Sequence, residues 1–206
     1  MPGLGFKIFV IGFNKCGTRS LHTYFTECGL NSCHGGVQAN LHMAIAINVV
    51  RGRPALEGLD GFDAYSDIMS VRTQFRHLDR DYPGSRFIHN VRDPDRWIVS
   101  RLNHLGGRYV EFLNIYHEVD LSWTDWVAKW RRDLAAHERA VADHFRLRPL
   151  DLLRLDIEQD SLAALAGFLG IPAPARSASS LPRVGVTGRK HKRYILEGGQ
   201  IIKRDP

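Results

Sequence analysis

Short apolar runs alternate along the chain with longer stretches in which apolar residues recur at helical spacing. Residues 6–12 form an apolar run that is rich in β-forming residues and ends on glycine, which predicts a buried first strand. A second strand is predicted at 86–91, directly after the Pro83-Gly84 turn, and a third at 150–155.

Helical spacing predicts three helices among these strands. The clearest runs from about Ser122 to Phe145, where Ser122 and Asp125 resemble a capping box. Two shorter helices, near 21–28 and 162–169, end at Gly29 and Gly170. One face of the long helix carries Trp123, Trp126, Val127, Trp130, Leu134, Val141 and Phe145. We interpret its tryptophans as core rather than as an aromatic ligand pocket.

Strands separated by helical stretches predict an α/β fold, with a three-layer α/β/α arrangement around a mainly parallel central sheet. The 206 residues, 44% of them hydrophobic, fit a single domain over 1–206 whose C-terminal segment, 176–206, is basic and irregular. Ligands of such sheets bind at the carboxyl ends of the strands, so the segments that follow the strands are the candidate site.

Composition narrows the class of protein. No apolar run reaches the roughly 18–20 residues that a membrane span needs, and the N-terminal stretch, with Lys7 in its middle, predicts a strand rather than a signal peptide. Three scattered cysteines favour a reducing cytoplasm over a disulfide framework. The net charge of +6 predicts an anionic partner, and nucleic acid, anionic lipid and a phosphorylated nucleotide all qualify.

The loop after the first predicted strand has the features of an anion-binding turn. It connects a strand to a helix, whose first N–H groups and dipole favour negative charge. Gly17 permits close backbone approach, and Lys15 supplies a mobile positive charge. The loop residues that we expect to surround the anion are Asn14, Lys15, Cys16, Gly17, Thr18, Arg19 and Ser20.

Two other interpretations of this loop are weaker. The ordinary nucleotide-triphosphate loop has its lysine directly after the second glycine, whereas Lys15 precedes Gly17 by two positions. No apolar strand ends in an obvious magnesium-binding aspartate either. A phosphatase-type Cys16 nucleophile would need an arginine six positions later, and His22 stands there instead. We expect His22 to be a packing or surface residue.

A second motif follows the second predicted strand. Pro94 suits the first position of a helix and Asp93 its cap, with Arg92 at the strand end and Ser100 about two turns into the helix. An arginine donates two parallel, charge-assisted hydrogen bonds to a phosphate. Without a phosphate, the same pattern describes a capped helix whose arginine pairs with Asp93 or Asp95.

Together, Gly12-x-x-Lys15-x-Gly17-Thr18-x-x-Leu21 and the Arg92–Ser100 pair resemble the family of sulfotransferases that depend on 3′-phosphoadenosine 5′-phosphosulfate (PAPS), which has a P-loop NTPase-like fold. The resemblance covers roughly residues 6–105. It implies that Lys15 contacts the transferring sulfonate, that Arg92 and Ser100 hold the 3′-phosphate, and that no metal is required. It also implies a C-terminal cover for that phosphate, for which Arg189 and Lys190 are candidates.

The resemblance further implies a base near the loop at the end of a strand, and His34 and Asp67 are the candidates. An unperturbed histidine, with a pKa near 6.5, suits proton transfer at neutral pH better than an aspartate near 3.9. Burial that raises the pKa of Asp67 would make it a base too; otherwise it orients the acceptor or His34. We favour His34 and leave Asp67 open.

The leading hypothesis is therefore a cytoplasmic enzyme that transfers sulfonate from PAPS to a hydroxyl or amine of a small-molecule or glycan acceptor and releases PAP. A nucleotide-triphosphate-dependent kinase or NTPase is the alternative, and the displaced Lys15 argues against it. A non-catalytic anion- or nucleic-acid-binding module is the third. We expect no nucleic acid partner, because the basic tail lacks interleaved aromatic residues. The oligomeric state stays open, a homodimer included.

Overall fold

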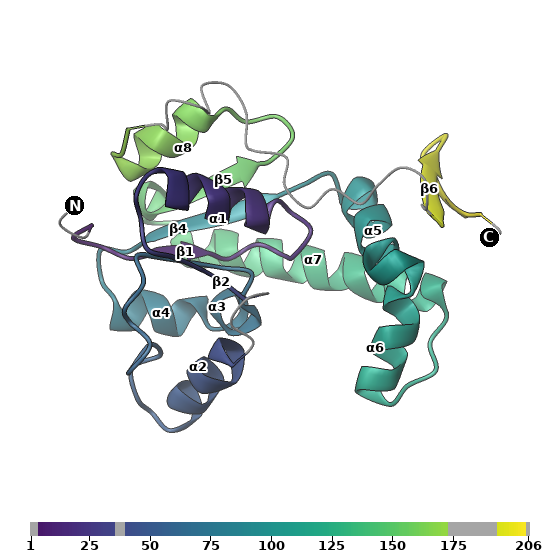
Figure 1. Ribbon diagram of the computed structural model, residues 1–206, viewed down its shortest axis with the longest axis horizontal. Coiled ribbons are helices and arrows are strands. Elements are labelled where there is room, and N and C mark those ends of the chain that lie inside the picture. Colours follow the sequence, from purple (N-terminus) through teal and green to yellow (C-terminus); the bar gives the residue numbers. More distant parts are fainter. Residues whose placement is uncertain (1–3, 36–39, 173–192, 205–206) are drawn as a thin grey trace. The chain divides into compact units, whose positions relative to one another are not determined.

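The computed structural model describes residues 4–35, 40–172 and 193–204. These residues form two compact units. The sheet unit comprises 4–91 and 143–172, and the helical unit comprises 92–142 and 193–204. Figure 1 labels most of their elements, and we describe each unit by itself.

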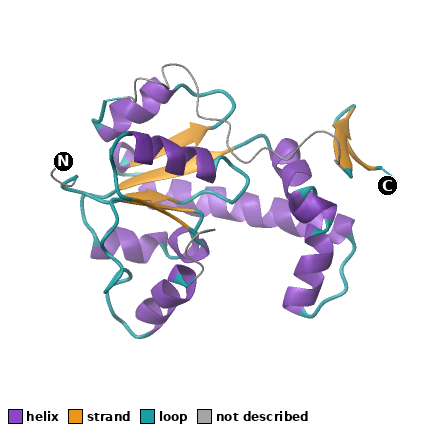
Figure 2. Ribbon diagram, viewed as in Figure 1, coloured by secondary structure: helices purple, strands orange, loops and turns teal. Residues whose placement is uncertain are grey.

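Five parallel strands form the sheet of the first unit (Figure 2). They are β1 (Ile8–Val10), β2 (Ser32–His34), β3 (Ala64–Ser66), β4 (Arg86–Val91) and β5 (Leu152–Asp156), in the order β2-β3-β1-β4-β5. The strands predicted near 6–12, 86–91 and 150–155 are confirmed as β1, β4 and β5. A 3₁₀ turn, Pro149–Asp151, occupies the first positions of the third prediction, so β5 begins two residues late.

Helices cover both faces of this sheet because its strands alternate apolar side chains between the faces. Ile8 and Val10 pack with α1 (Thr18–Glu27) and α8 (Leu162–Leu169) in one buried cluster. On the other face Phe9 contacts Phe87, which in turn contacts Phe145 at the end of α7 (Trp123–Phe145). α4 (Phe75–Asp81) lies on this second face in Figure 1. The predicted three-layer α/β/α fold is confirmed.

The segment between β2 and β4 holds elements that the sequence pattern did not predict: α2 (Leu41–Val50) and α3 (Met69–Thr73), besides β3 and α4. Strands β2 and β3 have three residues each, too few for a period to be recognised. Helix α2 is apolar nearly all round, so its periodicity is weak as well.

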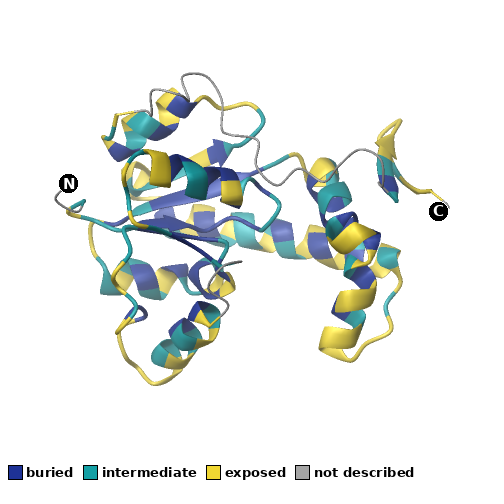
Figure 3. Cartoon of the chain, in the orientation of Figure 1, coloured by how far each residue is buried: buried dark blue, intermediate teal, exposed yellow. Residues whose placement is uncertain are grey.

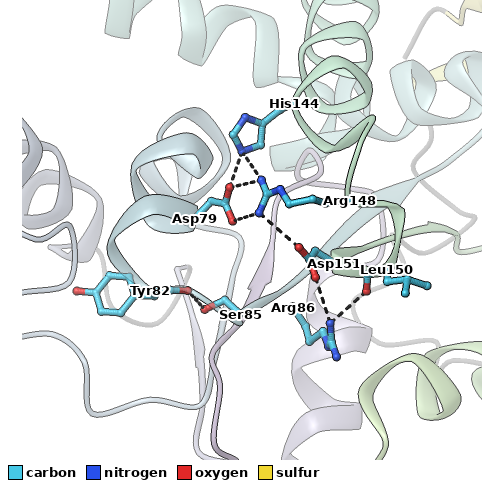
Figure 4. A network of polar contacts seen from close by, with 8 residues as sticks. All are labelled: Asp79, Tyr82, Ser85, Arg86, His144, Arg148, Leu150 and Asp151. Atoms are coloured by element: carbon cyan, nitrogen blue, oxygen red, sulfur yellow. Dashed lines mark hydrogen bonds and ion pairs between the residues drawn. The ribbon is translucent and has the colours of Figure 1, made fainter.

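The amino ends of β4 and β5 carry a network of charged side chains (Figure 4). The Asp79 carboxylate lies 2.7 Å from Nε2 of His144, and its other oxygen accepts a 3.0 Å hydrogen bond from Nη1 of Arg148. Arg148 and Arg86 both reach Asp151, each at 3.4 Å. The network ties α4, the end of α7 and the start of β5 to one another.

The helical unit contains α5 (Pro94–Leu102), a 3₁₀ turn (His104–Gly107), α6 (Tyr109–His117), α7 up to residue 142, and the strands β6 (Tyr194–Glu197) and β7 (Gln200–Lys203). The predicted capping box of α7 is confirmed: the Ser122 N–H donates to Asp125 at 3.0 Å, and the Asp125 N–H donates to Ser122 Oγ at 3.2 Å. Trp126 and Trp130 are buried, as expected for core residues, whereas Trp123 is half-buried. In Figure 3, buried and exposed segments alternate along α7.

The prediction of an irregular C-terminal segment is wrong for residues 194–203, which form an antiparallel hairpin. Its two-residue turn, Gly198-Gly199, has both φ angles positive, the conformation that matches the twist of a tight hairpin. The hairpin is anchored by Asn103, which accepts from the Tyr194 N–H at 3.1 Å and donates to the Tyr194 carbonyl at 2.7 Å. Within the described residues, no helix is long and apolar enough to cross a membrane.

Candidate functional site

The order of the strands creates a point where the chain reverses direction across the sheet. β1 and β4 are neighbours, yet the chain runs from β1 to β2 at one edge and from β4 to β5 at the other. Such a switch leaves room for a ligand at the carboxyl ends of the two strands. The predicted loop follows β1, while His34 ends β2 and Asp67 follows β3.

Close packing explains the two glycines of the loop. A Cβ on Gly12 would stand 2.0 Å from the Asn90 carbonyl oxygen of β4, which no side chain can tolerate. Gly17 caps α1 with φ +75°, and a Cβ there would meet Ile157 at 3.0 Å. Lys15 also has a positive φ, +65°, a conformation that costs a non-glycine residue free energy. The loop is therefore pressed onto β4 and onto the segment after β5.

The predicted loop residues differ in their exposure to solvent. Asn14, Lys15 and Gly17 are half-buried and Arg19 is exposed, whereas Cys16, Thr18 and Ser20 are buried. Helix α1 starts at Thr18 and has no acidic residue of its own in its first turn, which leaves the positive end of its dipole directed at the loop. This arrangement is suited to a phosphate or sulfonate group.

Asn90 holds the two ends of the loop, and the sequence analysis missed it. Its Oδ1 accepts a 2.9 Å hydrogen bond from the Gly12 N–H, and its Nδ2 donates a 2.6 Å bond to the Cys16 carbonyl. Asn90 lies near the carboxyl end of β4 and is 1% exposed. The available signal was a polar amide in a strand predicted to be buried, because buried amides are kept only where they bond.

The two candidate bases are brought together beside the loop. Nε2 of His34 lies 3.5 Å from Oδ2 of Asp67, with the His34 side chain 4% exposed and the Asp67 side chain 23% exposed. Asp67 has a φ of +57° and packs tightly, since a Cβ on Gly35 would come within 2.2 Å of its carbonyl oxygen. The sequence placed both residues at strand ends, and the sheet places them side by side.

The electrostatics of this pair disfavour charge on either group. Burial, with smaller contributions from His22 and Arg19, lowers the pKa of His34 to about 4, so its imidazole is neutral at neutral pH. Burial raises the pKa of Asp67, and the Thr18 hydroxyl together with the charges of Lys15 and Arg19 only partly opposes this. The influence of Lys15 and Arg19 links the pair to the loop.

His22, expected to be a packing or surface residue, packs beside His34. Its ring centroid lies 5.5 Å from that of His34, and its Nδ1 lies 2.8 Å from the Ser32 hydroxyl. Burial lowers the pKa of His22 as well. His22 thus packs against one side of the His34 ring and helps to fix its orientation.

Arg92 and Ser100 belong to the helical unit. Asp93 caps α5 by accepting a 2.9 Å hydrogen bond from the Arg96 N–H, and Asp95 pairs with Arg131. Arg92 and Ser100 are both half-buried.

The helix that carries Ser100 is held by an arginine among aromatic rings. The Arg101 guanidinium lies 4.4 Å from the ring centroid of Trp130, 5.0 Å from that of Trp97 and 5.5 Å from that of Tyr109.

The remaining predicted residues, Arg189 and Lys190, lie outside the described residues. Over the described ranges, no group of three or more His, Cys, Asp or Glu side chains could hold a metal ion.

A parallel sheet with a glycine loop after its central strand, and an acid–histidine pair beside that loop, defines an α/β protein with a candidate anion site at the carboxyl ends of its strands. Comparison with protein families makes the class specific: residues 7–187 match the model of a sulfotransferase domain. The match covers most of the chain, so this chain belongs to the sulfotransferase family, and the fold expected from the resemblance is confirmed. No curated protein matches the sequence.

Proposed function

We propose that this protein transfers the sulfonate group of PAPS to a hydroxyl or amine of a small-molecule or glycan acceptor by in-line displacement. The observation that carries the proposal is the glycine loop after β1, whose lysine lies close enough to Asp67 to affect its pKa. Family membership supports sulfotransfer in general, and the position of Lys15 two residues before Gly17 supports PAPS rather than a nucleoside triphosphate as donor.

The loop supplies most of the electrostatic stabilisation in this proposal. Backbone N–H groups at the start of α1, that of Thr18 included, bind the 5′-phosphosulfate, and the Lys15 ammonium neutralises charge on the sulfonate and the leaving phosphate. Because these groups are fixed before the reaction, they need little reorganisation as charge develops. Arg92 and Ser100, with Arg189 and Lys190 in the C-terminal segment, are proposed to hold the 3′-phosphate.

The acceptor's oxygen or nitrogen forms the new bond to sulfur while the bond from sulfur to the 5′-phosphate oxygen breaks, which yields the sulfonated acceptor and PAP. A base must contact the acceptor to take its proton. Asp67 exposes more of its side chain than His34, and its raised pKa makes it a better base than an ordinary aspartate. We therefore assign proton removal to Asp67 and its orientation to the neutral His34, the reverse of the preference drawn from sequence alone.

Calorimetric titration of the purified protein with PAP, and separately with ATP and magnesium, tests the proposed donor. We expect PAP to bind and ATP to bind far more weakly, because only PAP carries a 3′-phosphate for the second motif. Binding of ATP in preference to PAP would favour the kinase or NTPase alternative. Salt-dependent DNA binding that PAP does not affect would instead favour the binding module.

A further inference from the structure

We infer that Asn90 is a positioning residue that sets the shape of the anion-binding loop and turns the Gly17 N–H toward the bound group. The inference deepens the proposed function, because it names the residue through which β4 controls the donor site. It rests on the Asn90 bridge, which we define as the hydrogen bonds from Asn90 to Gly12 and Cys16.

Strand pairing fixes the position from which the Asn90 side chain reaches the loop. Ile88, two residues before Asn90, pairs with Val10 of β1, and Asn90 itself pairs with Leu155 of β5. The Ile11 N–H donates to the Ile88 carbonyl at 2.9 Å, so the register between β1 and β4 persists up to the start of the loop. The backbone of Asn90 is therefore held from both sides, and its amide reaches the loop from a rigid strand.

The Asn90 bridge also sets the orientation of the Cys16–Gly17 peptide group. The Cys16 carbonyl points at Nδ2 of Asn90, and in a planar trans peptide the next N–H points in the opposite direction. The Gly17 N–H is consequently turned away from Asn90 and from the buried strand. Gly17 is half-buried and caps α1, so this N–H adds to the donors at the positive end of the helix.

Only an amide satisfies both ends of the loop. The Gly12 N–H needs an acceptor and the Cys16 carbonyl needs a donor, and asparagine supplies one of each within a single planar group. A carboxylate of the same shape keeps the acceptor but faces the Cys16 carbonyl with an oxygen. That pair of oxygens would repel, so the Cys16–Gly17 peptide should rotate and withdraw its N–H from the anion site.

The test compares Asn90→Asp with the matched control Asn48→Asp. Asn48 also donates from Nδ2 to main-chain carbonyls, those of Ala55 and Glu57, but it lies in α2. Two quantities are measured on each folded variant and on the wild type: hydrogen exchange of the amides of residues 12–18, and the dissociation constant for PAP. Measurement well below each variant's unfolding temperature separates positioning from stability.

We expect Asn90→Asp to accelerate exchange in the loop and to weaken PAP binding about tenfold or more, while Asn48→Asp leaves both within about twofold of the wild type. Unchanged loop exchange, or unchanged PAP affinity in a folded Asn90→Asp protein, would overturn the inference. A wild type that fails to bind PAP contradicts the proposed function instead, and loop exchange then still decides whether Asn90 shapes the loop.

If Asn90→Asp does not fold, the wild-type protein provides the decisive measurement by NMR. The Asn90 side-chain NH₂ protons should exchange with water far more slowly than those of Asn31, an exposed asparagine whose amide bonds the Gly61 carbonyl. The Gly17 amide resonance should shift more on addition of PAP than the Gly12 resonance, because Gly12 already donates to Asn90. Equal exchange of the two side chains, or a larger shift at Gly12, would overturn the inference.

Discussion

Two aspartate–histidine pairs lie at opposite ends of the same parallel sheet, and the pKa values of their carboxyl groups move in opposite directions. At the carboxyl ends of the strands, Asp67 lies 3.5 Å from His34, and burial raises its pKa. At the amino ends, burial also acts on Asp79, but hydrogen bonds from Arg148 and His144 outweigh it and lower the pKa. The same two residue types therefore experience opposite environments within one unit.

The difference lies in what surrounds each carboxylate. Asp79 has an arginine in direct contact and is bonded through both oxygens, so its charge is compensated. Asp67 has a hydrogen bond from the Thr18 hydroxyl but feels Lys15 and Arg19 only as charges, and it has a positive φ, as Lys15 does. Burial that is only partly compensated, together with backbone strain, is typical of residues at functional sites. The amino-end network stabilises the fold, and the carboxyl-end pair is available for chemistry.

The largest effect is expected from removing the cation of the carboxyl-end site. Lys15→Ala should reduce sulfonate transfer by about 10²–10³-fold or more, since it deletes a preorganised positive charge at the transferring group. Unfolding free energy should change little, because Lys15 is a half-buried loop residue with a strained φ. Turnover of PAPS and urea denaturation measure the two quantities.

The control for this variant is Lys129→Ala, which removes an exposed lysine paired with Asp133 on α7. It changes the net charge of the protein by the same amount and should leave transfer unaffected. A Lys15→Ala protein with near-normal rates would remove the loop from the proposed mechanism.

The next-largest effects are expected from replacing Asp67 and Asp79, each by asparagine. Asp67→Asn should lower the rate of transfer by about 10²–10⁴-fold, the usual contribution of a general base. It should leave the protein as stable as the wild type or more so, because it removes a poorly compensated buried charge. Asparagine also tolerates the positive φ of this position better than most residues.

The matched variant, Asp79→Asn, should do the reverse. It leaves Arg148 and His144 without their carboxylate, which should cost about 1–3 kcal/mol of unfolding free energy at neutral pH, with the rate of transfer retained. The lowered pKa of Asp79 stabilises the fold above the unfolded value near 3.9, so the difference from wild type should vanish as the pH falls through the folded pKa. Loss of transfer in Asp79→Asn, or full activity in Asp67→Asn, would break the contrast.

The sequence predicted the site at the carboxyl ends of the strands better than the network at their amino ends. The loop was found because it follows an apolar strand and carries two glycines, and His34 and Asp67 were found because the family resemblance implies a base near that loop. The amino-end network could not be predicted, since Asp79 and Arg148 are 69 positions apart and only the folded sheet brings them together. Asn90 had a signal, a polar amide in a buried strand, but its partners Gly12 and Cys16 are 78 and 74 positions away, so only the folded sheet shows what it bonds.

The prediction of individual helices and strands also depended on how clear the local sequence signal was. β4 and α7 were predicted almost to the residue, because a turn precedes one and a capping box begins the other. The hairpin β6–β7 had a signal, a Gly-Gly pair between two short apolar runs, but the adjacent basic stretch led to the wrong interpretation.

The smallest effect concerns the pH dependence of stability and comes from His34. Its folded pKa is about 4, whereas an unfolded histidine titrates near 6.5. Between these values the unfolded chain binds a proton that the folded chain does not, so His34 makes the free energy of unfolding fall as the pH decreases from about 6.5 to about 4. One such group contributes a slope of at most ~1.4 kcal/mol per pH unit.

His34→Gln should remove this contribution and flatten the stability profile across that window, and urea denaturation at a series of pH values measures it. NMR titration of the wild type provides an independent check: the His34 ring resonances should stay those of a neutral imidazole down to about pH 5. Equal slopes for the variant and the wild type, or a His34 ring that protonates near pH 6.5, would mean that the fold leaves the pKa of His34 at its ordinary value. A slope of opposite sign would mean that the pKa is raised; His34 would then be an ionised partner of Asp67, and the carboxyl-end pair would resemble the compensated pair at the amino end.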